Sequence, residues 1–248
     1  MKKKLKLEVV RRHYPNALTT LDTVNRIFDI VEQHYDIDPF QIMFADSICS
    51  DDVNSIEYPS RAHEMLGPFK MGGLDGFPFT GLTGMGAFAS HVPEDGAVFI
   101  YYAPHIGISG NGDVGTINRI GQSKPSGCCG AARAALGKLQ RNEIEAGNIT
   151  ELDYQMNSIE QIFLKQQARI LASSNQLIEA TEVMYEAIDE RICLLADKTK
   201  YPCRYLMLMG AILINGDHDM GSFSSCRRFE VVDLQTNEVK SFIDELEK

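Results

Sequence analysis

Ala97-Val-Phe-Ile-Tyr-Tyr-Ala103 is an uninterrupted apolar run, and Pro104 and His105 follow it directly. The run is rich in β-branched and aromatic residues and has the length of one buried strand, so we expect a strand that ends at Pro104. Three more runs of the same kind predict further strands, and they are Gln41 to Ala45, Tyr205 to Ile214 and Arg228 to Asp233. His105 therefore lies just past the carboxyl end of a predicted strand.

Helical patterns separate these strands. Val24, Ile27, Phe28 and Val31 recur at helical spacing behind a group of capping residues that begins at Thr19. Residues 131–139 consist mostly of strong helix formers, and residues 153–197 carry apolar side chains on helical faces. Strands that alternate with helices indicate an α/β fold, a central sheet flanked by helices. We expect residues 1–248 to form a single domain of this kind.

The composition narrows the range of partners and compartments. The net charge is −10, so an acidic surface would repel nucleic acid and anionic membranes, and we expect neither as a partner. No apolar run approaches the roughly 20 residues of a membrane-spanning helix, and no signal peptide is visible. The six cysteines do not form the spaced framework of a disulfide-rich secreted domain. We expect a cytoplasmic protein with reduced thiols.

Three residues of metal-binding types lie where a sheet of this class gathers its functional side chains. Cys49 and His105 each follow a predicted strand, and Cys129 lies at the start of a predicted helix. Two thiolates and one imidazole would bind Zn²⁺ and leave a fourth position open, which is the pattern of a catalytic site. A buried apolar thiol at Cys49 and a structural histidine at His105 are the competing interpretations, and Cys128 is an alternative to its neighbour Cys129.

Two charged residues close to Cys49 extend the candidate site. Asp51 lies in the same loop, and Arg61 follows a short distance along the chain. An arginine that holds an aspartate keeps the carboxylate ionised and oriented, so that it can accept a hydrogen bond from a metal-bound water. Asp52 competes with Asp51 for this role, and an exposed ion pair without function is the alternative.

Several segments together resemble the limiting-CO2-inducible protein B family, also called the θ class, which is related to the β-carbonic anhydrases. The resemblance runs from about residue 9 to about residue 235, and the segments are Ala45-Asp-Ser-Ile-Cys-Ser-Asp-Asp52, Gly72-Gly-Leu-Asp-Gly-Phe-Pro-Phe79, Gly81-Leu-Thr-Gly-Met-Gly-Ala-Phe88, His91-Val-Pro-Glu-Asp-Gly96, Ala103-Pro-His-Ile-Gly107 and Ser126-Gly-Cys-Cys-Gly-Ala131. The resemblance implies a β-carbonic-anhydrase-like sheet, a homodimer, and zinc held by Cys49, His105 and Cys129. It also implies an Asp51–Arg61 dyad. The choice of Cys129 over Cys128 rests on the resemblance.

The function that follows from the resemblance is the reversible hydration of CO2 to bicarbonate by zinc-bound hydroxide. CO2 is apolar, and the glycine-rich segment of residues 71–88 offers Phe77, Phe79, Leu82 and Phe88 as a possible lining for its pocket. Two other functions stay open. The chain could be a catalytically silent component that binds CO2 or bicarbonate in a carbon-concentrating system, or Cys49 and His105 could form the nucleophile and base of a thiol hydrolase.

Overall fold

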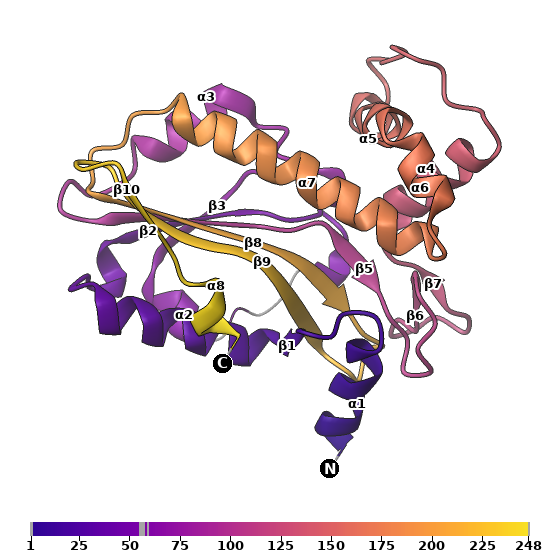
Figure 1. Cartoon of the computed structure of the whole chain (residues 1–248), viewed down its shortest axis with the longest axis horizontal. Coiled ribbons are helices and arrows are strands. Elements are labelled where there is room, and N and C mark those ends of the chain that lie inside the picture. Colours follow the sequence, from indigo (N-terminus) through magenta and orange to yellow (C-terminus); the bar gives the residue numbers. More distant parts are fainter. Residues whose placement is uncertain (1, 55–57, 59, 248) are drawn as a thin grey trace.

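The computed structural model describes residues 2–54, 58 and 60–247 and places a mixed sheet at the centre of the chain (Figure 1). The sheet has the strand order β1-β9-β8-β4-β2-β3, while β10 pairs with β9 and β5 pairs with β8. Its strands are β1 (Leu18–Thr19), β2 (Ile42–Ser47), β3 (Leu66–Lys70), β4 (Ala97–Tyr102), β5 (His105–Gly107), β8 (Tyr205–Asn215), β9 (Ser222–Asp233) and β10 (Glu238–Ser241). A separate small hairpin is formed by β6 (Thr116–Ile117) and β7 (Ser126–Gly127).

Helices cover both faces of the sheet. In Figure 1, α2 and α8 lie on one face and α3 and α7 on the other, with α4, α5 and α6 gathered at one end. The α-helices are α1 (Lys2–Arg11), α2 (Thr20–His34), α3 (Gly81–Ala89), α4 (Gly130–Gln140), α5 (Tyr154–Lys165), α6 (Gln167–Ala172), α7 (Gln176–Asp197) and α8 (Ile243–Leu246). Short 3₁₀ helices occur at η1 (Pro39–Gln41), η2 (Asp52–Asn54), η3 (Ser60–Glu64) and η4 (Leu74–Gly76).

The central strands β2, β4 and β8 run parallel, so their carboxyl ends meet at one edge of the sheet. Cys49 follows the end of β2 by two residues. His105 opens β5, which continues beside β8 and places His105 opposite Leu213. The chain segments that carry the candidate ligands therefore converge at this carboxyl edge.

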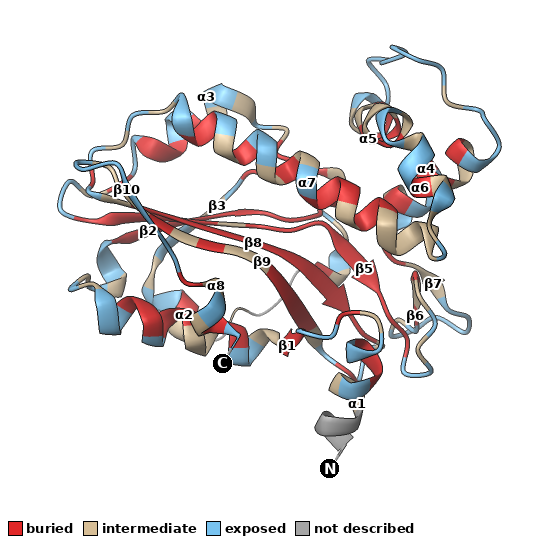
Figure 2. Ribbon diagram, in the orientation of Figure 1, coloured by how far each residue is buried: buried red, intermediate tan, exposed pale blue. Residues whose placement is uncertain are grey.

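Alternation along β4 shows how the sheet divides the core. Val98 and Ile100 pack into the cluster on the α7 face, whereas Phe99 between them packs into the cluster on the α2 face. Successive side chains of a strand point to opposite faces, so a strand that is apolar throughout needs helices on both sides. Figure 2 shows buried residues along the central strands and along the side of α7 that faces the sheet.

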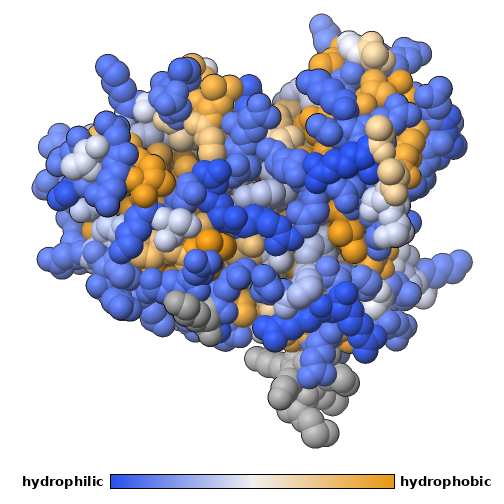
Figure 3. All heavy atoms as spheres, viewed as in Figure 1, coloured by the Kyte–Doolittle hydropathy of each residue, from blue (hydrophilic) through white to orange (hydrophobic). Residues whose placement is uncertain are grey.

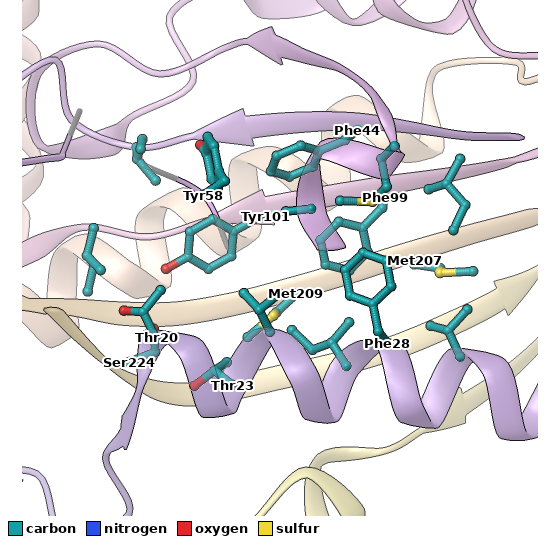
Figure 4. A pocket seen from close by; sticks show the side chains of 18 residues that line it. Thr20, Thr23, Phe28, Phe44, Tyr58, Phe99, Tyr101, Met207, Met209 and Ser224 are labelled. Carbon is teal, nitrogen blue, oxygen red and sulfur yellow. The ribbon is translucent and has the colours of Figure 1, made fainter. Parts of the chain in front are cut away.

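An apolar cavity of about 60 Å³ lies between α2 and the sheet (Figure 4). Phe28 of α2 and Phe44, Phe99, Met207 and Met209 of the strands line it. The four strand residues belong to the α2-face cluster, whereas Cys49 and Cys129 belong to the cluster on the other face. The cavity is therefore distinct from the candidate metal centre.

The predicted α/β class and the four predicted strands are confirmed, although the last strand starts at Ser222 instead of Arg228. The predicted helical region of residues 153–197 is also confirmed and consists of three helices, α5 to α7. Strands β1, β3, β5, β6, β7 and β10 were not predicted. β1 has only two residues, and β3 and β10 are largely exposed edge strands without the apolar run that marked the central strands.

Hydrophilic residues cover most of the face drawn in Figure 3, with hydrophobic residues in small separate groups between them. Within residues 2–54, 58 and 60–247, no helix is both long enough and apolar enough to cross a membrane.

Candidate metal centre

Cys49, His105 and Cys129 meet at the carboxyl edge of the sheet. Each residue offers a ligand atom there, and these three atoms all lie within 4.8 Å of one another. All three residues are buried, with 5% or less of each exposed. Cys129 is the residue that precedes the first turn of α4, as predicted. Residues that are far apart in the sequence thus form one compact Cys/His/Cys group.

The two ring nitrogens of His105 have different surroundings. Nδ1 lies 2.8 Å from Oδ1 of Asn215, the last residue of β8. Nε2 has no hydrogen-bond partner among the described residues, although the ring is buried. A buried polar atom without a partner is rare and calls for an explanation such as a bound ion. Nε2 is therefore the nitrogen that is free to bind a metal.

The donor set fits zinc. Thiolate sulfur and imidazole nitrogen are the ligands that Zn²⁺ takes most often, and three protein ligands leave a fourth position for water or substrate. Four buried side-chain polar atoms lack a partner in the part of the chain that the structure describes, and two of them, His105 Nε2 and Asp75 Oδ2, belong to this site. Both are metal-binding or proton-accepting atoms.

The pKa values of Cys49 and Cys129 are displaced in opposite directions. A hydrogen bond from Cys129 holds the pKa of the Cys49 thiol well below its ordinary value, and the nearby His105 ring acts in the same direction against the effect of burial. The same hydrogen bond, together with burial and the charge of Asp75, raises the pKa of Cys129. The two shifts favour the thiolate form at Cys49 over that at Cys129.

Cys128 also points into the site, contrary to the expectation that only one of the two adjacent cysteines would do so. Its Sγ lies 3.5 Å from both His105 Nδ1 and Asn215 Oδ1. With Asp51 and His105 it forms a second group of possible ligand atoms that lie within 4.8 Å of one another. Of the two adjacent cysteines, however, only Cys129 belongs to the group that contains Cys49.

Asp51 lies beside the cluster, with its Oδ2 4.0 Å from His105 Nε2. Arg119 donates to both of its oxygens, from Nη1 to Oδ1 and from Nη2 to Oδ2, each over 3.0 Å. Burial, the largest single effect, would raise the pKa of Asp51, but hydrogen bonds from Arg119, Asp52 and the Val53 backbone and the charge of His105 together leave the pKa below its ordinary value. Asp51 is thus an ionised, oriented carboxylate next to the free nitrogen of His105.

The predicted pair between Asp51 and Arg61 is wrong. Arg61 lies on η3 and faces α2, where it donates to Asp29 over 2.8 Å and to Glu32 over 2.5 Å and lies over the Phe28 ring. The Arg61 guanidinium therefore has its partners on α2 and not on Asp51. Arg119 takes the predicted place of Arg61 instead.

Arg119 was not identified from the sequence because it is distant from Asp51 along the chain. It lies in the loop between β6 and β7, and its Nε donates to Ser126 Oγ over 2.9 Å. The hairpin turns this loop back toward the segment that carries Asp51. One feature of the sequence could have indicated it: Arg119 is a basic residue in the glycine-rich segment that precedes Cys128 and Cys129.

Asp75 is a second residue that the sequence did not identify. It is fully buried, its backbone N–H donates to Cys49 Sγ over 3.1 Å, and its Oδ1 accepts from the backbone N–H of His105. Burial raises the pKa of Asp75 to about 7. The residue, which lies on η4, therefore connects the sulfur of Cys49 to the backbone of His105.

Gly76 makes this packing possible. Its φ is +80°, and a Cβ atom at this position would lie 2.2 Å from the carbonyl oxygen of Ala103. Only glycine combines this backbone conformation with such a close approach. The glycine-rich segment is thus shaped to fit against the strand end that precedes His105.

The aromatic lining expected for a CO2 pocket is only partly placed near the site. Phe77 and Phe79 pack against each other behind η4, with ring centroids 5.0 Å apart. Phe88 is a fully buried core residue that packs on Phe69, and Leu82 is 55% exposed on α3. Phe88 therefore belongs to the hydrophobic core and Leu82 to the surface.

The comparisons with known proteins agree with this geometry. The family described as limiting CO2-inducible proteins B/C, β-carbonic anhydrases, matches residues 18–233. The crystal structure of a single-residue variant of PtLCIB4, a homolog of the limiting CO2-inducible protein LCIB, is 29% identical, with a TM-score of 0.85 over 96% of this chain and 99% of that chain. Unaltered PtLCIB4 is 27% identical, with a TM-score of 0.82 over 95% of this chain and 98% of the other.

A more distant structure supports the fold alone. The crystal structure of LCIB itself is 18% identical, with a TM-score of 0.71 over 93% of this chain and 95% of that one. Among the curated proteins, none matches the chain.

Proposed function

Because the chain belongs to the family of limiting CO2-inducible proteins B/C, we propose that it is a zinc-dependent carbonic anhydrase that interconverts CO2 and bicarbonate. One observation carries the proposal: the ligand atoms of Cys49, His105 and Cys129 lie within 4.8 Å of one another in a buried group. The unpartnered Nε2 of His105 supports it, since a structural histidine would normally have both nitrogens satisfied.

In this proposal Cys49, His105 and Cys129 hold the zinc ion. Bound there, zinc would act as a Lewis acid and bring the pKa of a water molecule from 15.7 down to about 7. The protein's contribution is a fixed set of three ligands on separate elements and a buried setting. The positive end of the α4 dipole favours the thiolate form of Cys129.

Asp51 is proposed as the residue that orients the reacting water. Its carboxylate is ionised and lies 4.0 Å from His105 Nε2, so it can accept a hydrogen from a water at the open ligand position. By accepting this hydrogen, Asp51 would orient the water for its reaction with CO2. Arg119 keeps the carboxylate charged and fixed in orientation through its two parallel hydrogen bonds.

The test is a stopped-flow assay of CO2 hydration on protein of known zinc content. We expect one zinc per chain and hydration well above the uncatalysed rate. Stoichiometric zinc without hydration would refute the enzymatic function and favour a binding component for CO2 or bicarbonate. Protein that takes up no zinc would instead favour the thiol hydrolase, which is supported by the lowered pKa of Cys49 and its place beside His105.

We further propose that the protein is a homodimer in the cytoplasm. The family resemblance supports the dimer, and sedimentation equilibrium would test it. Cysteines 49, 128, 129, 193, 203 and 226 are all free, which supports a reducing compartment.

A further inference from the structure

Two buried asparagines, Asn54 and Asn215, connect Cys49 to His105. The Asn54 side-chain amide donates from Nδ2 to the backbone carbonyl of Cys49 over 3.4 Å. The Asn215 amide donates from Nδ2 to Oδ1 of Asn54 over 3.1 Å, and its own Oδ1 lies 2.8 Å from His105 Nδ1. The chain of contacts therefore starts at the backbone of one candidate ligand and ends at the ring of another.

The contact between Asn54 and the Cys49 carbonyl fixes which group donates in each of the following hydrogen bonds. A backbone carbonyl can only accept, so the group of Asn54 that faces Cys49 must be its NH2, and its Oδ1 must face Asn215. Asn215 then has to present its NH2 to Asn54. The carbonyl of Val53, which also accepts from Asn215 Nδ2 over 3.5 Å, imposes the same orientation.

The opposite end of Asn215 therefore presents only an acceptor. Its Oδ1 faces His105 Nδ1 and accepts from the thiol of Cys128 over 3.5 Å. In the reversed orientation, the Asn215 oxygen would face the backbone carbonyl of Val53 and the side-chain carbonyl of Asn54, and neither of these groups could donate to it. Asn54 and Asn215 are 4% and 3% exposed, so water cannot compensate for such a mismatch.

An acceptor at Nδ1 determines the tautomer of His105. The hydrogen bond made by one ring nitrogen decides which nitrogen carries the proton, and an acceptor retains the proton on Nδ1. Nε2 then holds the lone pair, and Nε2 is the nitrogen without a partner at the Cys49–Cys129 group. Zinc requires this unprotonated nitrogen.

We propose that Asn215, oriented by Asn54, is a positioning residue that sets the tautomer of His105 so that Nε2 can bind the metal. The inference rests on the metal site of the proposed function and assigns roles to two residues outside the ligand set. Partners of this kind typically change metal affinity by about 10–100-fold when they are removed.

The experiment measures zinc affinity by competition with a chromophoric chelator, independently of CO2 hydration. Asn215→Leu removes the acceptor and should weaken zinc binding by about 10–100-fold. Asn215→Asp keeps an acceptor at Nδ1 and should bind zinc far more tightly than Asn215→Leu. Circular dichroism spectra establish that each variant is folded.

A double variant separates orientation from packing. Asn54→Leu removes the nearer of the two acceptors that orient the Asn215 amide and leaves only the 3.5 Å contact with the Val53 carbonyl, so zinc affinity should fall. A carboxylate at position 215 presents an acceptor in either orientation, so Asn54→Leu combined with Asn215→Asp should recover most of the lost affinity. Rescue would not occur if Asn54 served packing alone.

The outcomes discriminate clearly. Wild-type zinc affinity in Asn215→Leu, or an absence of rescue in the folded double variant, would overturn the inference. Zinc binding that follows the expected order in a protein without CO2 hydration would overturn the proposed function and leave the tautomer assignment standing.

Discussion

Arg119 forms a bidentate ion pair with Asp51, with both N–H···O contacts at 3.0 Å. The guanidinium is itself fixed by Ser126, which accepts from Nε, and it is only 14% exposed. Two parallel hydrogen bonds define the plane of a carboxylate as well as its charge. The relationship joins the β6–β7 loop to the loop after β2, and so it closes one side of the candidate metal centre.

Arg119→Ala should lower kcat/KM for CO2 hydration by about 10–100-fold, because Asp51 loses the group that orients it. Arg119→Lys should recover little, since one ammonium cannot reproduce the two parallel contacts. Zinc content should stay at the wild-type level in both variants. Stopped-flow kinetics together with metal analysis provide the check.

Arg61→Ala is the matched control for this prediction. Arg61 pairs with Asp29 and Glu32 on α2 and not with Asp51, so hydration should stay close to the wild-type rate. The loss in stability should be within about 1 kcal/mol, as for other partly exposed ion pairs. If Arg61→Ala were inactive and Arg119→Ala active, the assignment of the Asp51 partner would be reversed.

Asp51→Asn should retain zinc and lose about 10²–10⁴-fold in kcat, the usual range for removal of a proton acceptor. The amide can still accept from Arg119, but it bears no charge and is a poor acceptor for the hydrogen of a reacting water. Equal hydration rates for Asp51→Asn and the wild-type protein would show that the carboxylate has no role.

Cys129→Ser and Cys128→Ser form a neighbouring pair with opposite expected results. Cys129→Ser, like Cys49→Ser and His105→Ala, should lose stoichiometric zinc and the stability that zinc adds to the folded state. Cys128→Ser should retain zinc, because Cys128 is outside the Cys49 group and a hydroxyl can still donate to Asn215. The measurement is zinc per chain after dialysis. Zinc loss in Cys128→Ser alone would transfer the ligand role to Cys128.

Gly76→Ala should destabilise the fold by more than about 1 kcal/mol, because a Cβ would meet the Ala103 carbonyl and φ is positive. Gly86→Ala is the control: Gly86 lies inside α3 with nothing within 4 Å of the added Cβ, so this variant should gain about 0.5–1 kcal/mol. Urea unfolding measures both changes. Equal midpoints for the two variants would argue against the close fit of η4.

The sequence was sufficient for the elements that carry the ligands. Buried strands such as β4 appear as continuous apolar runs, and the residues that follow them are easily located, so Cys49, His105 and Cys129 could be placed at strand ends and a helix start. β3 and β10 could not be found in this way, because exposed edge strands lack an apolar pattern.

The supporting residues of the site were harder to predict, for physical reasons. Proximity along the chain suggested Arg61 for Asp51, but the fold decides which arginine is near, and it brings Arg119 there. Asn215 ends a strand and Asp75 lies in a glycine-rich turn, so both have the sequence character of ordinary turn residues. Their roles depend on contacts between segments that are far apart in the chain.

The cavity under α2 affects how this layer responds to pressure. The side lined by Phe28 and Phe99 contains empty volume, and unfolding eliminates internal voids, so the unfolded chain occupies less volume than the folded one. Hydrostatic compression should therefore loosen the packing of α2 against the sheet.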